Sequence, residues 1–167
     1  MAGWKTLDGP LGAQMDQVDS SAVFQMGATA RARYIDSSSA VAYHGEFIYQ
    51  KGVASCAAGK WVALNYDNDT VALLPDAHRG PVALAVAATV ADTYGWFQRS
   101  GKGLGLLAAS VADNAALHCS GTAGQAGAAA SGLTEIMGAR AAAASGSSAA
   151  NTEVEIQYPV CTSVEPA

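Results

Sequence analysis

The clearest pattern of apolar positions lies at residues 81–87, where large and small apolar side chains alternate. Val82, Leu84 and Val86 fall on one face of an extended chain and alanines fall on the other, because successive side chains of a strand point to opposite faces. Alanine leaves little space, so the alanine face must lie close to a neighbouring part of the molecule. The pattern predicts a well-defined β-strand.

Shorter runs of β-branched and aromatic residues, bounded by glycine, proline or acidic turn residues, recur along the chain and indicate further strands. Residues 60–66 and 70–74 are separated by Asp67-Asn68-Asp69, which favour a turn, so these two strands predict a hairpin. The other expected strands are residues 46–50, 94–99, 104–107, 115–119, 135–141 and 152–158.

Two more pairs of strands are expected from the segments between them. Residues 94–99 and 104–107 flank Gly101-Lys102-Gly103 and predict a second hairpin. Residues 135–141 and 152–158 predict a third pair across a linker of serine, glycine and alanine.

The last expected strand, residues 152–158, is predicted to have one solvent-exposed face and one buried face. In residues 152–158, acidic and amide side chains alternate with Val154, Ile156 and Tyr158. Pro159 is expected to end this strand, because proline has no N–H to donate to a neighbouring strand.

Two segments of small residues require a separate interpretation. Residues 120–132 predict a loop. Residues 139–150 are rich in alanine and have high helix propensity, but Gly138 and Gly146 bracket them and they carry no large apolar stripe to bury. We expect strand or loop there rather than helix.

About eight short strands at intervals of about 8–12 residues are typical of an all-β domain. We expect a small β-barrel or β-sandwich, of the β-tulip or jelly-roll-like kind, with an extended N-terminal arm. Residues 1–30 form the arm, residues 31–161 the β-rich domain and residues 162–167 a C-terminal tail. The βαβ alternation of a nucleotide-binding sheet is absent.

The arm follows neither a helical nor a strand period, but apolar residues are spaced through it. Met15, Val18, Phe24 and Met26 are candidate anchors. Such a segment either wraps around its own domain or lies on a neighbour, and the phenylalanine and the two methionines favour contact over a free tail.

Alanine accounts for much of the 50% hydrophobic content. The chain has 37 alanines, whereas isoleucine, leucine, valine and phenylalanine together number 31. Because each fully buried large side chain contributes only about 1.5–3 kcal/mol, the core is thin for this length. We expect a compact domain that completes its burial against partners; the alternative is a tightly packed, alanine-rich monomer.

The charge and hydropathy exclude several classes of partner. The formal net charge is −5 and the isoelectric point is about 4.9, whereas a nucleic-acid-binding surface is normally basic. No apolar run approaches the roughly 18 residues of a membrane span. The first ten residues lack a continuous apolar stretch, so no secretory signal is visible. We expect no nucleic-acid and no membrane partner.

No set of residues predicts catalysis. The segment from Gly95 to Gly103 departs from the G-x-x-x-x-G-K-[ST] phosphate loop, because five residues separate its first two glycines and a glycine follows Lys102. A G-x-S-x-G serine turn is absent. Glu153 and Glu155 share a strand face, whereas catalytic carboxylates need a cleft and a raised pKa. We expect no enzyme activity and no cofactor.

Metal binding is not expected either. Asp67-Asn68-Asp69 lacks the glycine and distant glutamate of an EF-hand loop. Cys56, Cys119 and Cys161 form no C-x-x-C pair, and His118 beside Cys119 supplies too few ligands. We expect three free thiols, buried as small apolar groups in a reducing compartment.

The order of the glycine-bounded strands resembles that of a known family. The segments that carry the likeness are residues 11–18 (LGAQMDQV), 45–54 (GEFIYQKGVA), 57–62 (AAGKWV), 80–87 (GPVALAVA), 94–98 (YGWFQ) and a terminal alanine-rich hairpin ending at 154–160 (VEIQYPV). Over residues 11–161 the chain resembles the head decoration, or cement, proteins of tailed bacteriophages.

This resemblance implies a non-enzymatic virion structural protein, made in the host cytoplasm and bound to the outer surface of a capsid. Such proteins commonly sit at three-fold or quasi-three-fold positions, often as trimers, and clamp neighbouring capsomers. The expected partners are the major capsid protein and further copies of the chain in a homotrimer. The family has no catalytic residues to transfer.

The arm is expected to make much of the capsid contact through Met15, Val18, Phe24 and Met26, unless these residues fold back onto their own barrel. Two other functions stay open. One is a different virion subunit, such as a tail-tube, spike or head-fibre protein. The other is a carbohydrate- or ligand-binding barrel with Trp61 or Trp96 as a platform, which predicts a monomer with a concave apolar pocket.

Overall fold

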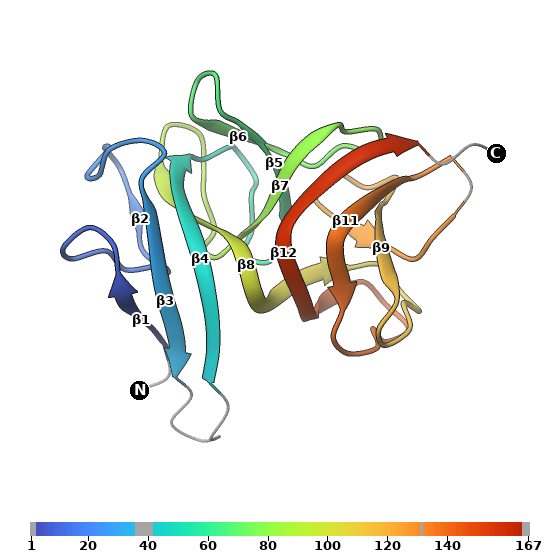
Figure 1. Ribbon diagram of the computed structural model, residues 1–167. Helices are drawn as coiled ribbons and strands as arrows, with labels where there is room; N and C mark the ends of the chain where they lie inside the picture. The colour runs from blue at the N-terminus through green and yellow to red at the C-terminus, as the bar shows by residue number, and fades with distance from the viewer. Residues whose placement is uncertain (1–2, 36–41, 131, 165–167) are drawn as a thin grey trace.

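Every regular element in the described part of the chain is a β-strand. The computed structural model describes residues 3–35, 42–130 and 132–164, and no helix occurs among them (Figure 1). The predicted all-β class is therefore confirmed. The strands are β1 (Gly3–Asp8), β2 (Val18–Asp19), β3 (Thr29–Ile35), β4 (Ala42–Lys51), β5 (Trp61–Asn65), β6 (Thr70–Leu73), β7 (Gly80–Ala85), β8 (Tyr94–Leu107), β9 (Ala116–Cys119), β10 (Ala126–Gly127), β11 (Thr134–Ala141) and β12 (Ala150–Val164).

Strand β8 joins two closed rings of strands. One ring runs from β8 through β4, β6, β5 and β7 back to β8, and the other runs from β8 through β12, β11, β9 and β10 back to β8. A further pairing of β12 with β7 connects the rings. The rings lie side by side in Figure 1, with β12, β11 and β9 on the right. Strands β1 and β3 extend the sheet beyond β4, and β2 pairs with β8.

The buried side chains form three clusters, which correspond to the two rings and the N-terminal region. The C-terminal cluster comprises Trp61, Ala63, Leu74, Val82, Leu84, Leu107, Val111, Leu117, Cys119, Ala126, Ile136, Ala139, Ala141, Val154, Ile156 and Cys161. The central cluster comprises Ile48, Cys56, Val62, Leu64, Val71, Ala83, Ala85 and Phe97. The N-terminal cluster comprises Ala13, Met15, Ala30, Ala32, Phe47, Tyr49 and Trp96.

Strand β7 confirms the predicted alternation for residues 82–85 and explains it, whereas Val86 follows the strand and packs against the N-terminal cluster. Val82 and Leu84 lie in the C-terminal cluster, whereas Ala83 and Ala85 lie in the central cluster. The strand therefore separates two cores. Its alanine face lets the residues of the central cluster pack close to the strand. The hairpin of β5 and β6 and the antiparallel pair of β11 and β12 are also confirmed.

The prediction of a second hairpin at 94–107 is wrong. These residues form one strand, β8, whose first part pairs with β4 and whose last part pairs with β12. Gly101 has a φ of 101°, and a Cβ on it would overlap the carbonyl oxygen of His44. The glycine thus lets β8 bend closely past β4 and continue into the second ring, instead of reversing the chain.

The predicted end of the last strand at Pro159 is also wrong, since β12 continues to Val164. The register of β12 against β11 shifts between the pairs Ala139–Ile156 and Met137–Val160, so Pro159 lies in a bulge where no N–H is needed. The bulge also changes the face of Tyr158, whose φ is 47°.

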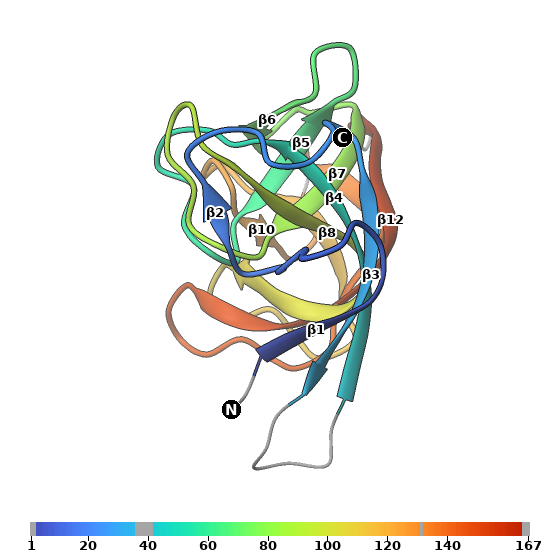
Figure 2. The same cartoon turned by 90° about the vertical axis from the view of Figure 1, so that its left-hand side faces the viewer.

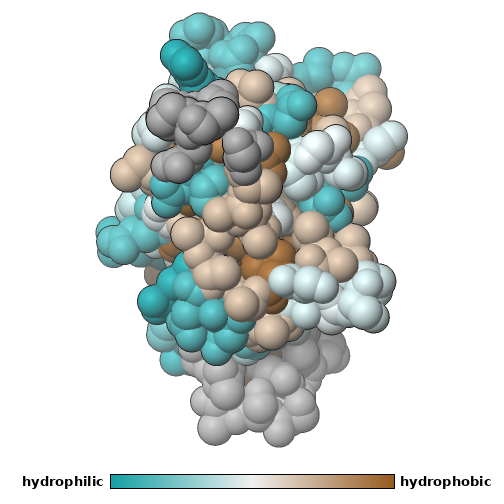
Figure 3. Space-filling view, turned by 90° about the vertical axis from the view of Figure 1, so that its right-hand side faces the viewer, coloured by the Kyte–Doolittle hydropathy of each residue, from teal (hydrophilic) through white to brown (hydrophobic). Residues whose placement is uncertain are grey.

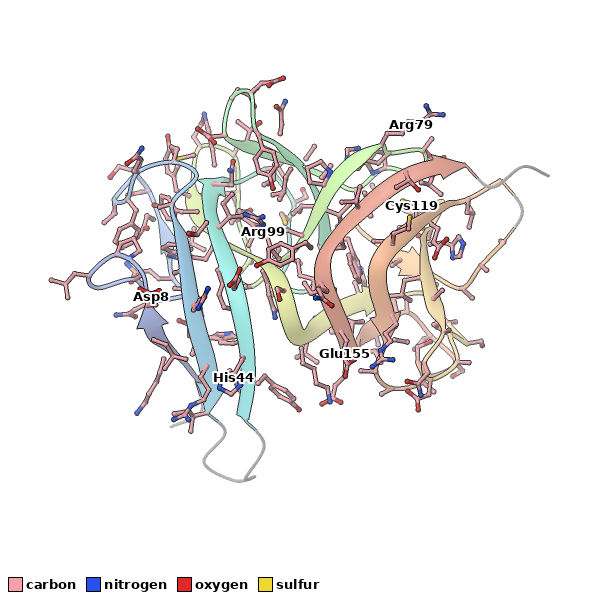
Figure 4. All side chains as sticks on the ribbon, viewed as in Figure 1. Asp8, His44, Arg79, Arg99, Cys119 and Glu155 are labelled. Carbon is pink, nitrogen blue, oxygen red and sulfur yellow. The ribbon has the colours of Figure 1, made fainter. Side chains whose placement is uncertain are left out.

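Tyr158 was expected on the buried face of the last strand but is exposed. Its hydroxyl donates a hydrogen bond to Glu46, and the guanidinium of Arg99, which is labelled in Figure 4, lies 5.1 Å from its ring centroid. The hydrogen bond from Tyr158, followed by the interaction with Arg31, lowers the pKa of Glu46.

The two segments of small residues largely follow expectation. Residues 139–141 end strand β11, residues 142–149 form a loop without a helix, and Ala150 begins β12. Residues 120–132 contain the short strand β10 inside the predicted loop.

Candidate functional site

The predicted arm lies against its own domain, as far as it is described (residues 3–30). Figure 2 shows this segment in blue, crossing one side of the molecule. Strand β1 pairs with β3 and β2 pairs with β8. Contact of the arm with a partner stays a prediction.

The four predicted anchors all lie on this segment, at different depths. Met15 is fully buried in the N-terminal cluster. Phe24 and Met26 are partly buried against the same cluster, and the Phe24 ring is 5.2 Å from that of Tyr49. Val18 is partly buried and pairs with Gly95 across β2 and β8. These side chains hold the segment on the barrel.

A buried hydrogen bond fixes the middle of the segment. The Tyr49 hydroxyl donates to Asp19 Oδ2 over 2.7 Å, and the Val23 N–H donates to the same hydroxyl over 3.3 Å. Gln17 donates to the other oxygen of Asp19. Burial, and then the hydrogen bond to Asp19, raise the pKa of Tyr49 to about 12.

This raised pKa predicts a loss of stability at high pH. Tyrosine in an unfolded chain titrates near about pH 10, so the folded state favours the protonated phenol. The stabilisation is complete below about pH 10 and is lost as the pH rises to about 12. Urea unfolding across this range tests it: the wild type should lose more stability than Tyr49→Phe. Equal losses would contradict the interpretation.

The same segment presents apolar side chains outward, and these are not among the predicted anchors. Leu7 is 59%, Leu11 101% and Val23 61% exposed. Leu11 lies in a turn closed by a hydrogen bond from Ala13 N–H to the Pro10 carbonyl. The surrounding glycines and proline were a sequence signal for this exposed turn. An anchored segment with exposed apolar side chains is suited to binding another surface.

A second apolar surface lies on the opposite side of the molecule. Figure 3 shows a band of apolar residues crossing this face between polar margins. Met137 on β11 is 51% exposed, and the alanines of residues 128–130 are also exposed. Exposed apolar patches of this kind often mark interaction surfaces.

The segments considered for catalysis lie in regular strands, and their charged side chains form ion pairs. Gly101-Lys102-Gly103 lies within extended β8 and forms no phosphate loop. Lys102 pairs with Glu153 at 2.7 Å, and Glu155 pairs with Arg140, so the two glutamates do not form a pair with each other. The hydrogen bond from Lys102 lowers the pKa of Glu153.

The candidate metal ligands are also dispersed. Asp67 donates its N–H to Asn65 Oδ1 and so begins the turn between β5 and β6. His118 is buried in β9. Across the described ranges, no three His, Cys, Asp or Glu side chains gather to hold a metal ion.

The three cysteines are free and buried, as predicted. Cys119, labelled in Figure 4, has its Sγ 3.5 Å from that of Cys161. Burial raises the pKa of Cys56, and the hydrogen bond to Cys119 together with burial raises the pKa of Cys161.

These thiols are expected to react slowly in the folded protein, because all three are buried away from a reagent in solution. For Cys56 and Cys161 the raised pKa values also limit the thiolate, which is the reactive form. Titration with Ellman's reagent should label none within minutes under native conditions and all three in concentrated guanidinium chloride. Rapid labelling of the native chain would contradict this prediction.

A cleft of about 440 Å³ lies between the β1–β3–β4 sheet and strands β8 and β12. Its aromatic lining residues are Trp4, Tyr34 and Tyr43, and its polar lining includes Gln98, Lys102, Asn151 and Glu153. No sequence pattern predicted this cleft. Trp61 and Trp96, the tryptophans proposed as platforms, lie instead in the core and are 0% and 2% exposed.

The chain matches no protein-family model and no curated protein.

Among the residues that the structure describes, no helix has the length and apolar character needed to span a membrane.

Proposed function

We propose that this chain is a decoration, or cement, protein of a tailed bacteriophage, which binds the outer capsid surface and clamps neighbouring capsomers. The observation that carries the proposal is the N-terminal segment, which is anchored by Met15 and the Tyr49–Asp19 bond but exposes Leu7, Leu11 and Val23. The order of short strands, which resembles that of decoration proteins, gives independent support.

The energetics fit such a role. Full burial of one large aliphatic side chain contributes about 1.5–3 kcal/mol, and the three exposed side chains gain part of this on contact with a capsid. Because this binding free energy exists only in the assembled shell, it stabilises that shell by linkage. Prior anchoring of the segment reduces the conformational entropy lost on binding.

Self-association into a homotrimer is the second part of the proposal. The apolar band in Figure 3 lies on the side opposite the N-terminal segment. One surface can therefore contact other copies while the other contacts the capsid. Light scattering over a dilution series should give the mass of a trimer; a monomer at every concentration would contradict this part.

Capsid binding is tested by co-sedimentation of the purified protein with capsids that lack it, taken from the phage that encodes it. The triple variant Leu7→Ser, Leu11→Ser, Val23→Ser should bind at least about tenfold more weakly, a change of about 1.4 kcal/mol. The control Tyr66→Ser, Val90→Ser also removes exposed apolar side chains, but outside the N-terminal segment, and should bind normally. Equal binding by the triple variant and the wild type would overturn the proposed contact.

A further inference from the structure

The cleft between β1–β3–β4 and β8–β12 combines an aromatic wall with a polar wall. Trp4 on β1 has its ring centroid 5.4 Å from that of Tyr34 and 4.8 Å from that of Phe47, both in edge-on geometry. Tyr34 stacks on Tyr43, with centroids 6.2 Å apart. These contacts hold the rings in place, and Trp4, Tyr34 and Tyr43 remain partly exposed in the cleft.

The opposite wall carries charged groups that are already fixed. Glu153 accepts a 2.6 Å hydrogen bond from the Tyr43 hydroxyl with one oxygen and pairs with Lys102 through the other. The Lys102 ammonium also lies 5.0 Å from the Tyr43 ring centroid. The wall is therefore preorganised, with its charges paired.

Two amides present acceptors to the cleft. Asn151 uses its Nδ2 to donate to the Ala58 carbonyl, which orients the side chain and leaves its Oδ1 for a ligand. Gln98, only 2% exposed, uses its Nε2 to donate to the carbonyls of Ser100 and Lys102. Both amide groups are thus held by the backbone in a defined orientation.

This combination excludes two ligand classes. A phosphorylated ligand requires cations, but Lys102, the only lysine or arginine among the described residues that line the cleft, is paired with Glu153, and Asp16 adds negative charge. A wholly apolar ligand would shield the Glu153 carboxylate and the Asn151 Oδ1 from water without offering them a hydrogen bond in return, which is costly.

A sugar ring fits both walls. One face of a pyranose presents C–H groups that pack on an aromatic ring, and its hydroxyls both donate and accept hydrogen bonds around the rim. The volume falls within the range of about 300–1,000 Å³ typical of small-molecule sites. We propose that this cleft binds a neutral oligosaccharide, with Trp4 as the stacking surface and Asn151 and Glu153 as hydrogen-bonding partners.

The test uses isotope-labelled full-length protein observed by NMR and titrated with maltohexaose, cellohexaose and chitohexaose. At least one sugar should shift the indole N–H of Trp4 and the side-chain amide of Asn151 in a saturable manner. The indole signals of Trp61 and Trp96, which lie in the core, should stay in place. Absence of a response to all three sugars, or shifts confined to other regions, would overturn the proposal.

Substitutions of single residues test whether the sugar binds in this cleft. Trp4→Ala and Asn151→Ala should each weaken binding of the responding sugar by about tenfold or more, whereas Tyr66→Ala, an exposed aromatic residue outside the cleft, should leave it unchanged. Asn151 is exposed, so its replacement keeps the test valid if Trp4→Ala does not fold. Unchanged sugar affinity in Asn151→Ala would contradict the assignment. Co-sedimentation with capsids is a separate readout, so failure of the sugar site and failure of the capsid role are distinguishable.

Discussion

Replacing Gly101 by alanine is expected to destabilise the protein by about 4 kcal/mol or more, a large part of the roughly 5–15 kcal/mol by which an ordinary domain is stable. The residue has a φ of 101°, which costs a non-glycine residue about 1–3 kcal/mol. In addition, the new Cβ would overlap the His44 carbonyl oxygen. That carbonyl cannot move freely, because Gly45 pairs with Gly101 across β4 and β8.

The matched control is Gly146→Ala. A Cβ on Gly146 would meet nothing within 4 Å, and its φ lies outside the left-handed region. Its stability should stay within about 0.5 kcal/mol of wild type. Urea unfolding of both variants measures the difference. A small effect of Gly101→Ala would mean that β8 does not bend at this residue as described.

Met15→Ala is expected to cost about 2–5 kcal/mol, because it removes a fully buried side chain from the N-terminal cluster. The loss should loosen the N-terminal segment before the rest of the barrel, since Met15 joins this segment to Tyr49 and Trp96. Urea unfolding measures the cost, and limited proteolysis should show earlier cleavage within the first 30 residues.

Leu11→Ala distinguishes residues that hold the N-terminal segment on the domain from residues that contact the capsid. Leu11 is fully exposed, so its truncation should leave the free energy of unfolding within about 0.5 kcal/mol of wild type while weakening capsid binding. If Leu11→Ala destabilised the isolated chain as much as Met15→Ala, the side chain would be part of the core. The proposed division of roles would then be wrong.

Local patterns predicted the elements whose determinants lie within a few residues. The alternation at 81–87 predicted β7, and Asp67-Asn68-Asp69 predicted the β5–β6 turn. The free, buried state of the cysteines followed from their number and spacing. In each of these cases, a short stretch of sequence contains the physical cause.

The wrong predictions concern segments whose structure depends on pairing with strands that are distant in the sequence. Glycines near 101 allow both a hairpin and a bent strand, and the choice depends on pairing of β8 with β4 and β12. Pro159 normally ends a strand, but the bulge opposite Gly138 accommodates it. A Cβ on Gly138 would lie 2.6 Å from the Gln157 carbonyl oxygen, so this bulge also needs a glycine.

The candidate sites were harder to predict for the same reason. The cleft brings Trp4 near the start of the chain together with Tyr34, Tyr43 and Glu153 from three other strands. No local motif links these residues. For the N-terminal segment, the apolar residues were recognised, but which ones face the core depends on the fold: Met15 is buried and Leu11 is exposed.

The proposed capsid role can be examined by electron cryo-microscopy of virions whose genome carries the coding sequence of this chain. We expect density for the chain on the outer capsid surface at three-fold or quasi-three-fold positions, with Leu7, Leu11 and Val23 against the capsid protein. Density in the tail tube, a spike or a head fibre would contradict it, as would a capsid-bound chain whose N-terminal segment faces solvent.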